Sequence, residues 1–245
     1  MPVSRSDGAL FAEVSYDMMG DKSKSKRVKK INKKINKTGF EVDKQHSGRD
    51  VLTLYNPKTN EVVISHKGTT PSRFKDLQAD LGIATGTQGK EFKRRTKKTE
   101  KALDAHPTAK AYGASHSLGS ASMYHTLLTS EKSRDRFDTV HGYNGGASII
   151  SSDAEKNARS DPEIKKKVNK IAKHHRVDGD VISASMTVNK PLGTMYTYQE
   201  KLDKKDKAKR VAFKAVSTPL AEGDKALNAH GLHHFYNKDQ YHNEE

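Results

Sequence analysis

The sequence contains no cysteine and no tryptophan, and only 7% of its 245 residues are aromatic. Without cysteine, the chain forms no disulfide and offers no thiolate for catalysis or metal binding. No apolar run approaches the roughly 18 residues that a membrane span requires. The amino terminus, Met1-Pro-Val-Ser-Arg-Ser, lacks the apolar core of a secretory signal. We therefore expect a soluble or peripheral protein, cytoplasmic or virion-associated rather than classically secreted.

Acidic residues are outnumbered by basic ones, 30 against 45, which gives a formal net charge of +15 at pH 7. Such an excess implies an anionic partner, either nucleic acid, an anionic membrane surface or an acidic scaffold. Many of the basic residues lie in segments 22–37 and 90–101. Each segment either contacts such a partner or is simply a solvated helix face. These segments hold a single aromatic residue, Phe92, and so lack the repeated aromatics of base stacking. Peripheral contact with an anionic membrane is therefore favoured over nucleic-acid binding.

Strand patterns alternate with helical patterns along most of the chain. This alternation predicts an α/β fold with a mostly parallel central sheet flanked by helices, and no linker divides the chain into two domains. We expect helices at residues 9–18, 22–37, 72–83, 90–105, 120–129 and 152–175, with a short helix within 221–237. We expect strands at residues 51–55, 62–66, 109–114, 138–143, 177–185, 195–199 and 211–216.

The most informative motif is Ser115-His116-Ser117-Leu118-Gly119, which lies between an expected strand and an expected helix. Small residues two before and two after a serine allow the sharp strained turn of a nucleophile elbow. The helix that follows points its amino-terminal N–H groups at the reacting oxygen. Ser117 is therefore the candidate nucleophile, although S-x-S-x-G strings also occur without function.

A serine nucleophile needs a general base and a carboxylate that orients the base, and on this type of sheet they follow in the order Ser, acid, His. Asp180 and His230 come after Ser117 in that order. Asp178 is an alternative acid, and His233 and His234 compete with His230. His230 and His234 also have the i, i+4 spacing of metal ligands. His174 and His175 are interpreted as the end of a basic helix.

Five segments of the chain resemble the class 3 lipase family, the fungal-lipase-like branch of the α/β-hydrolases. They are the strand and turn at 62–69, the Asp-containing tract at 76–81, the elbow at 115–119, the tract Asp180-Val-Ile-Ser183, and the tract at 230–235. In this resemblance Ser115 replaces a glycine, Ser183 replaces a proline and Lys67 replaces an arginine.

The resemblance implies that Ser117, Asp180 and His230 form a catalytic triad, with the N–H groups of Thr69 and Leu118 as the oxyanion hole. It implies one domain over residues 1–245, a lid formed by residues 82–105, and no cofactor or metal. The expected activity is hydrolysis of a lipid acyl ester, by a lipase or phospholipase, through an acyl-enzyme. The composition also resembles lipase-like proteins of large DNA viruses and phages.

Two other functions are compatible with the same residues. One is a non-catalytic basic protein on a lipase scaffold that binds nucleic acid or another anionic assembly. The other is a hydrolase that acts on a peptide or a different acyl donor. The three functions are distinguished by assays of ester hydrolysis, of salt-sensitive DNA binding and of turnover across a substrate panel.

Overall fold

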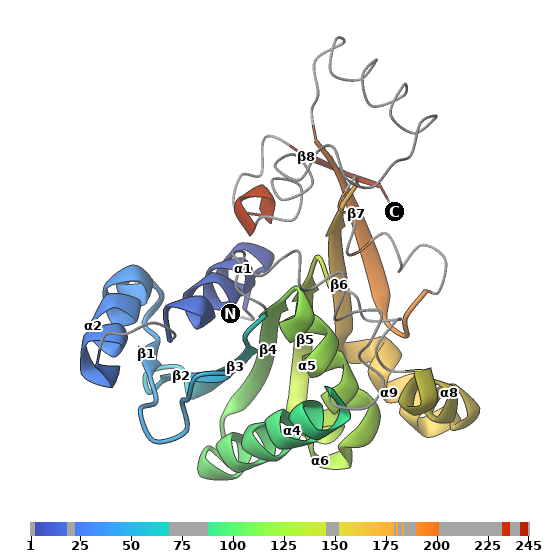
Figure 1. The fold of residues 1–245 in the computed structure, drawn as a ribbon, viewed down its shortest axis with the longest axis horizontal. Coiled ribbons are helices and arrows are strands. Elements are labelled where there is room, and N and C mark those ends of the chain that lie inside the picture. Colours follow the sequence, from blue (N-terminus) through green and yellow to red (C-terminus); the bar gives the residue numbers. More distant parts are fainter. Residues whose placement is uncertain are drawn as a thin grey trace.

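A single sheet organises the computed structural model, which describes residues 3–18, 23–68, 88–145, 152–178, 180, 183, 190–200, 232–235 and 241–244. Its eight strands lie side by side in the order in which they occur in the chain (Figure 1). They are β1 (Glu41–Val42), β2 (Val51–Asn56), β3 (Glu61–His66), β4 (Lys110–His116), β5 (Phe137–Tyr143), β6 (Ala172–Val177), β7 (Thr194–Glu200) and β8 (Tyr241–Glu244).

The central strands β3 to β7 are parallel, and antiparallel strands extend the sheet at both edges. β2 forms a hairpin with β3, β1 pairs with β2, and β8 pairs with β7. The four parallel pairings bring the carboxyl ends of β4, β5 and β6 to one edge, with His116 opposite Tyr143 and Tyr143 opposite His175. The predicted fold class, α/β with a mostly parallel sheet, is confirmed, and this edge is where such sheets bind ligands.

Helices cover both faces of the sheet (Figure 1). Helices α1 (Arg5–Val14) and α2 (Lys24–Ile35) bury Phe11, Val28 and Ile31 against one face. The other face is covered by α4 (Gln88–Ala105), α5 (Leu118–Thr129), α6 (Glu131–Arg136), α8 (Ser152–Ser160) and α9 (Pro162–Ile171). Short 3-10 helices are η1 (Ser15–Met18), η2 (Asn36–Thr38) and η4 (Leu232–Phe235).

Two apolar clusters form because strand side chains alternate between the faces. On β3, Val62 and Ile64 belong to the cluster under α4 and α5, whereas Val63 belongs to the cluster under α1 and α2. Strands buried on both faces need near-continuous apolar sequence, and this is why the hairpin and β4 were predictable. In the described part of the chain, every helix is too short or too polar to cross a lipid bilayer.

Two of the predicted elements are wrong. The expected helix at 152–175 is two helices, α8 and α9, followed by the strand β6, so His174 and His175 are buried strand residues and not a helix end. A strand was expected at 177–185, but the strand in this region is β6, which ends at Val177. Asp180 lies after that strand. Predictions for 72–83 and 211–216 fall outside the described residues, as do 82–87 of the expected lid.

Buried histidines explain the missed strand. The ring of His175 stacks on Tyr143 and Tyr196, at centroid distances of 5.0 and 5.1 Å. Its two nitrogens lie 2.9 Å from His141 Nδ1 and 2.8 Å from Tyr198 Oη. Burial, reinforced by the neighbouring His141, holds the pKa of His175 well below its usual value, so the ring is neutral. A neutral, fully bonded histidine packs in a sheet as an aromatic residue does.

Candidate active site

Ser117 occupies a strained turn at the carboxyl end of β4. Its φ is 55° and its ψ is −131°, and it is the N-cap of α5. Residues other than glycine rarely adopt a positive φ, and such strain collects at functional sites. The Ser117 N–H donates to Tyr143 O at 2.9 Å, while Ser117 O accepts from Ser120 N at 2.9 Å. The turn is therefore bonded to β5 on one side and to α5 on the other.

Two glycines let the turn pack against the end of β3. A Cβ on Gly119 would lie 2.0 Å from His66 O, so only glycine fits two positions after Ser117. A Cβ on Gly68 would lie 2.6 Å from His116 O and 3.1 Å from Ser117 Cβ. The chain that leaves β3 at Gly68 thus passes directly beside Ser117.

Ser115 fills the position that the resemblance expects to be glycine. It is fully buried, and its Oγ accepts a hydrogen bond from His66 N at 2.9 Å. This bond continues the contact between β3 and β4 beyond the last paired residues of the two strands, Ile64 and Gly113. The substitution therefore joins the elbow to β3 and leaves the turn intact.

Side chains that sequence reasoning missed hold the elbow from both faces of the sheet. On one face, Tyr16 Oη lies 2.8 Å from His116 Nδ1, and burial raises the pKa of Tyr16 well above its usual value. On the other, the buried guanidinium of Arg95 donates to Lys67 O at 2.5 Å. Tyr16 is a hundred residues from His116, so no local pattern could have identified it.

Asp180 lies just beyond β6, two strands from β4. It has no exposed surface, its N–H donates to Val177 O at 3.1 Å, and its Oδ2 accepts from Ser183 N at 2.7 Å. A proline at 183 could not make that bond, so the departure from the family pattern adds a donor to the carboxylate. Asp178, the alternative acid, is 36% exposed, and its Oδ1 lies 3.7 Å from Arg176 Nη2.

The turn after β5 forms hydrogen bonds with β6. Asn144, with a φ of 44°, donates from its N–H to His175 O at 2.7 Å, and its Oδ1 accepts from Val177 N at 2.9 Å. Gly142 and Gly145 lie close to Ser120, because a Cβ on either would stand 2.2 or 2.4 Å from Ser120 Oγ. Asn144 thereby fixes the end of β6, from which Asp180 follows.

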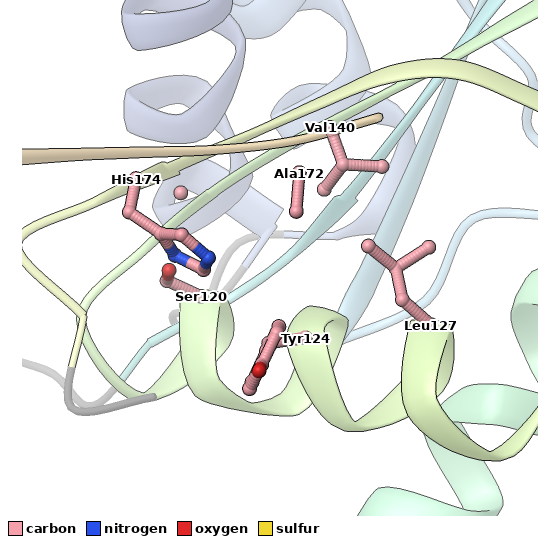
Figure 2. A pocket seen from close by; sticks show the side chains of 7 residues that line it. Ser120, Tyr124, Leu127, Val140, Ala172 and His174 are labelled. Atoms are coloured by element: carbon pink, nitrogen blue, oxygen red, sulfur yellow. The ribbon is translucent and has the colours of Figure 1, made fainter. Parts of the chain in front are cut away.

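A small cavity lies behind the elbow, between α5 and the sheet (Figure 2). Its volume is about 10 Å³, which is room for roughly one water molecule. The ring of His174 lies beside Ser120 at one end; its Nε2 donates to Leu192 O at 2.9 Å. Within the described residues nothing bonds to its buried Nδ1. Burial lowers the pKa of His174 to about 4. This cavity is too small for a substrate.

The structure brings part of the predicted site together. Ser115, His116, Ser117, Leu118, Gly119 and Asp180 all lie at the carboxyl ends of β4 and β6. Thr69 and His230 lie outside the described residues, as do the side chains of His233 and His234. The 3-10 helix η4 follows His230 by two residues, and its Phe235 packs on Tyr143 at a centroid distance of 4.9 Å.

No family model matches this chain, and no curated protein matches it. Among solved structures, lipase II from Rhizopus niveus is similar over 81% of this chain and 79% of its own, with 13% identity and a TM-score of 0.46. The lipase from Rhizopus microsporus var. chinensis is similar over 81% and 74%, with 13% identity and a TM-score of 0.45. The Rhizomucor miehei lipase–propeptide complex is similar over 80% and 67%, with 9% identity and a TM-score of 0.44. Likeness at this level concerns the course of the chain, whereas function depends on the site.

Proposed function

We propose that this protein is a serine esterase of the lipase type, in which Ser117 attacks the carbonyl carbon of a lipid acyl ester. The observation that carries the proposal is the backbone of Ser117, with its φ of 55° and ψ of −131° between β4 and α5. Folding to that conformation costs free energy, and the turn is held by hydrogen bonds and by the close approach of Gly68 and Gly119 to neighbouring backbone.

In the proposed mechanism His230 takes the Ser117 proton, and Asp180 orients the imidazole and stabilises its charged form. An acyl-enzyme forms, the alcohol leaves with the proton from His230, and water then releases the acid. Two strand spacings separate β4 from β6, about 10 Å, a gap that an imidazole bonded at both nitrogens bridges. The packing of η4 on Tyr143 and Tyr198, near the carboxyl ends of their strands, supports His230 as the base.

The oxyanion that forms in the first step needs donors fixed in advance. Leu118 is the first residue of α5, so its N–H has no acceptor within the helix and is directed outward. We assign the second donor to Thr69. Support comes from Gly68, which passes beside Ser117, and from Arg95, whose bond to Lys67 O anchors the start of that segment.

The substrate is proposed to be a phospholipid rather than a neutral triglyceride, because the protein is strongly basic. Of the proposed lid at residues 82–105, the structure describes the part from residue 88 onward, which is helix α4 and the connection after it. Helix α4 is anchored along its length by buried Phe92, Thr99 and Leu103.

The proposal is tested with p-nitrophenyl esters of short and long acids, phospholipid vesicles, triglyceride emulsions and a peptide substrate. We expect turnover of the esters and of phospholipid, and none of the peptide. A peptidase without esterase activity would overturn the substrate class. A folded protein that turns over nothing, but binds DNA in a salt-sensitive manner, would favour the non-catalytic binding protein instead.

Helix α2 is the proposed contact with an anionic membrane. Its apolar side is buried through Val28, Ile31 and Ile35. Lys30 and Lys34 pair with Asp17 of η1, at 2.5 and 2.9 Å. The exposed side carries Lys26, Lys29 and Lys33. Helix α4 presents further lysines on the other face of the sheet, so α2 and α4 cannot both lie flat on the same lipid surface through those faces.

We predict that changing Lys26, Lys29 and Lys33 together to glutamine weakens binding to phosphatidylglycerol vesicles by on the order of 100-fold, from about 1 kcal/mol per lysine near the lipid. The matched control changes Lys165, Lys166 and Lys170, which are exposed on α9. Cosedimentation with anionic and with phosphatidylcholine vesicles measures the effect. Equal losses in both triple variants would mean that net charge alone, and not α2, drives binding.

A further inference from the structure

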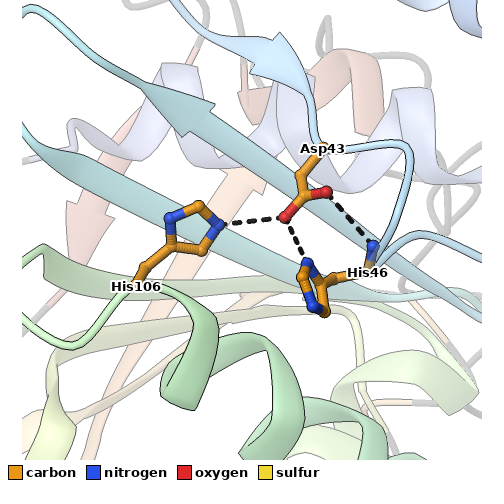
Figure 3. Close-up of side chains that lie close together, drawn as sticks. All are labelled: Asp43, His46 and His106. Atoms are coloured by element: carbon orange, nitrogen blue, oxygen red, sulfur yellow. Dashed lines mark hydrogen bonds and ion pairs between the residues drawn. The ribbon is translucent and has the colours of Figure 1, made fainter.

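Three polar side chains converge away from the candidate active site: Asp43, His46 and His106 (Figure 3). Asp43 follows β1, His46 lies three residues later, and His106 follows the end of α4. Asp43 Oδ2 lies 2.7 Å from His46 Nδ1 and 2.9 Å from His106 Nε2. Two imidazoles from distant parts of the chain thus direct a nitrogen at the same carboxylate oxygen.

The carboxylate of Asp43 is held without the help of the rings. Its other oxygen, Oδ1, accepts from Gln45 N at 2.9 Å and from His46 N at 3.1 Å. The backbone N–H of Asp43 donates to Thr53 O on β2 at 2.9 Å. Oδ2 therefore faces the two histidines in a fixed direction.

The ring of His106 is also fixed by contacts that leave Nε2 available. It stacks on Tyr55 at a centroid distance of 4.4 Å, with an angle of 25° between the planes. Arg136 Nη2 donates to His106 O at 2.8 Å, which holds the backbone. All three side chains are half-buried, with exposures of 13% for Asp43, 23% for His46 and 15% for His106.

We propose that Asp43, His46 and His106 bind one divalent transition-metal ion of the Zn²⁺ class. Two imidazole nitrogens and one carboxylate oxygen are ligands that Zn²⁺ prefers, whereas Mg²⁺ and Ca²⁺ select oxygen. Ligand atoms in a tetrahedral zinc site lie about 3.3 Å apart. The three atoms here all lie within 4.8 Å of one another, and small side-chain rotations bring them to that spacing. Partial exposure leaves the fourth position to water.

The position of this set separates it from the proposed ester hydrolysis. His106 precedes the amino end of β4, whereas Ser117 follows its carboxyl end. An ion bound there would join the loop after β1 to the connection between α4 and β4. It would replace hydrogen bonds to one carboxylate oxygen with three coordinate bonds, and so restrain the edge of the sheet.

The test is a Zn²⁺ titration of the full-length, metal-free protein at pH 7.5 against a chromophoric chelator. We expect one Zn²⁺ per chain, binding at least tenfold more weakly in His46→Gln and in His106→Gln. Asp43→Asn keeps the acceptor for Gln45 N and is expected to weaken binding while the fold is retained. Co²⁺ in place of Zn²⁺ should show the visible absorption of a tetrahedral ion, lost in His106→Gln.

His233→Gln/His234→Gln is the control for binding by the histidine-rich carboxyl-terminal segment, and its affinity should equal that of the wild type. Thermal unfolding in chelator shows whether each variant is folded before metal is added. The proposal is overturned if the wild type binds no Zn²⁺, or if the His233/His234 variant loses binding while the His46 and His106 variants keep it. The cluster would then be a set of hydrogen bonds that closes the loop.

Discussion

Changing Ser117 to alanine is expected to lower kcat for ester hydrolysis by about 10⁴- to 10⁶-fold. The substitution removes the attacking oxygen and leaves the oxyanion donors and the binding surface, so the remaining rate reflects only those. Alanine also keeps a Cβ at a φ of 55°, so the strain in the turn is unchanged. The free energy of unfolding should therefore stay close to that of the wild type.

Ser117→Gly separates the strain from the chemistry. Glycine adopts positive φ without a steric penalty, and relief of such strain is worth about 1–3 kcal/mol. After the entropic cost of glycine in the unfolded chain, we expect the variant to be inactive and about 1 kcal/mol more stable than Ser117→Ala. Urea unfolding of both variants measures this difference. If Ser117→Gly were instead the less stable, the turn would not be storing strain.

Changing Asp180 to asparagine is expected to lower kcat by about 10⁴-fold, because an amide cannot fix the imidazole tautomer that accepts the serine proton. Asparagine still accepts from Ser183 N through its Oδ1, so the local fold should survive. The matched variant is Asp178→Asn, two residues away and 36% exposed, for which we expect a change of less than a few-fold.

Steady-state kinetics on one soluble ester, with far-ultraviolet circular dichroism as the folding control, compares the two aspartate variants. The reverse order of effects would transfer the role of acid to Asp178. Equal and small effects would mean that neither carboxylate orients the base, and the catalytic triad would have to be revised.

Local patterns were sufficient for the parts of this fold that are determined locally. The hairpin of β2 and β3 was predicted from two apolar runs and the turn between them, and the structure pairs Val51 with His66 across it. The strained turn at Ser117 was predicted from five consecutive residues, one of which, Gly119, is required because it lies against His66 O.

Contacts between distant segments explain what the sequence did not predict. β6 contains Lys173, His174, His175 and Arg176, which read as a helix end until Tyr143 and Tyr196 are placed on either side of His175. The contributions of Tyr16 and Arg95 to the elbow likewise depend on contacts that only the folded chain makes. The convergence of His106 on Asp43 spans 63 residues and has no sequence signature.

The most direct test of the proposed serine nucleophile is labelling with a fluorophosphonate, followed by mass spectrometry of the peptides, on the wild type and on Ser117→Ala. The mechanism proposed here predicts one phosphonate per wild-type molecule, located on Ser117, and none on the variant. The mechanism would be contradicted if folded wild-type protein stayed unlabelled in the presence of lipid. It would also be contradicted if a label persisted on another serine in Ser117→Ala.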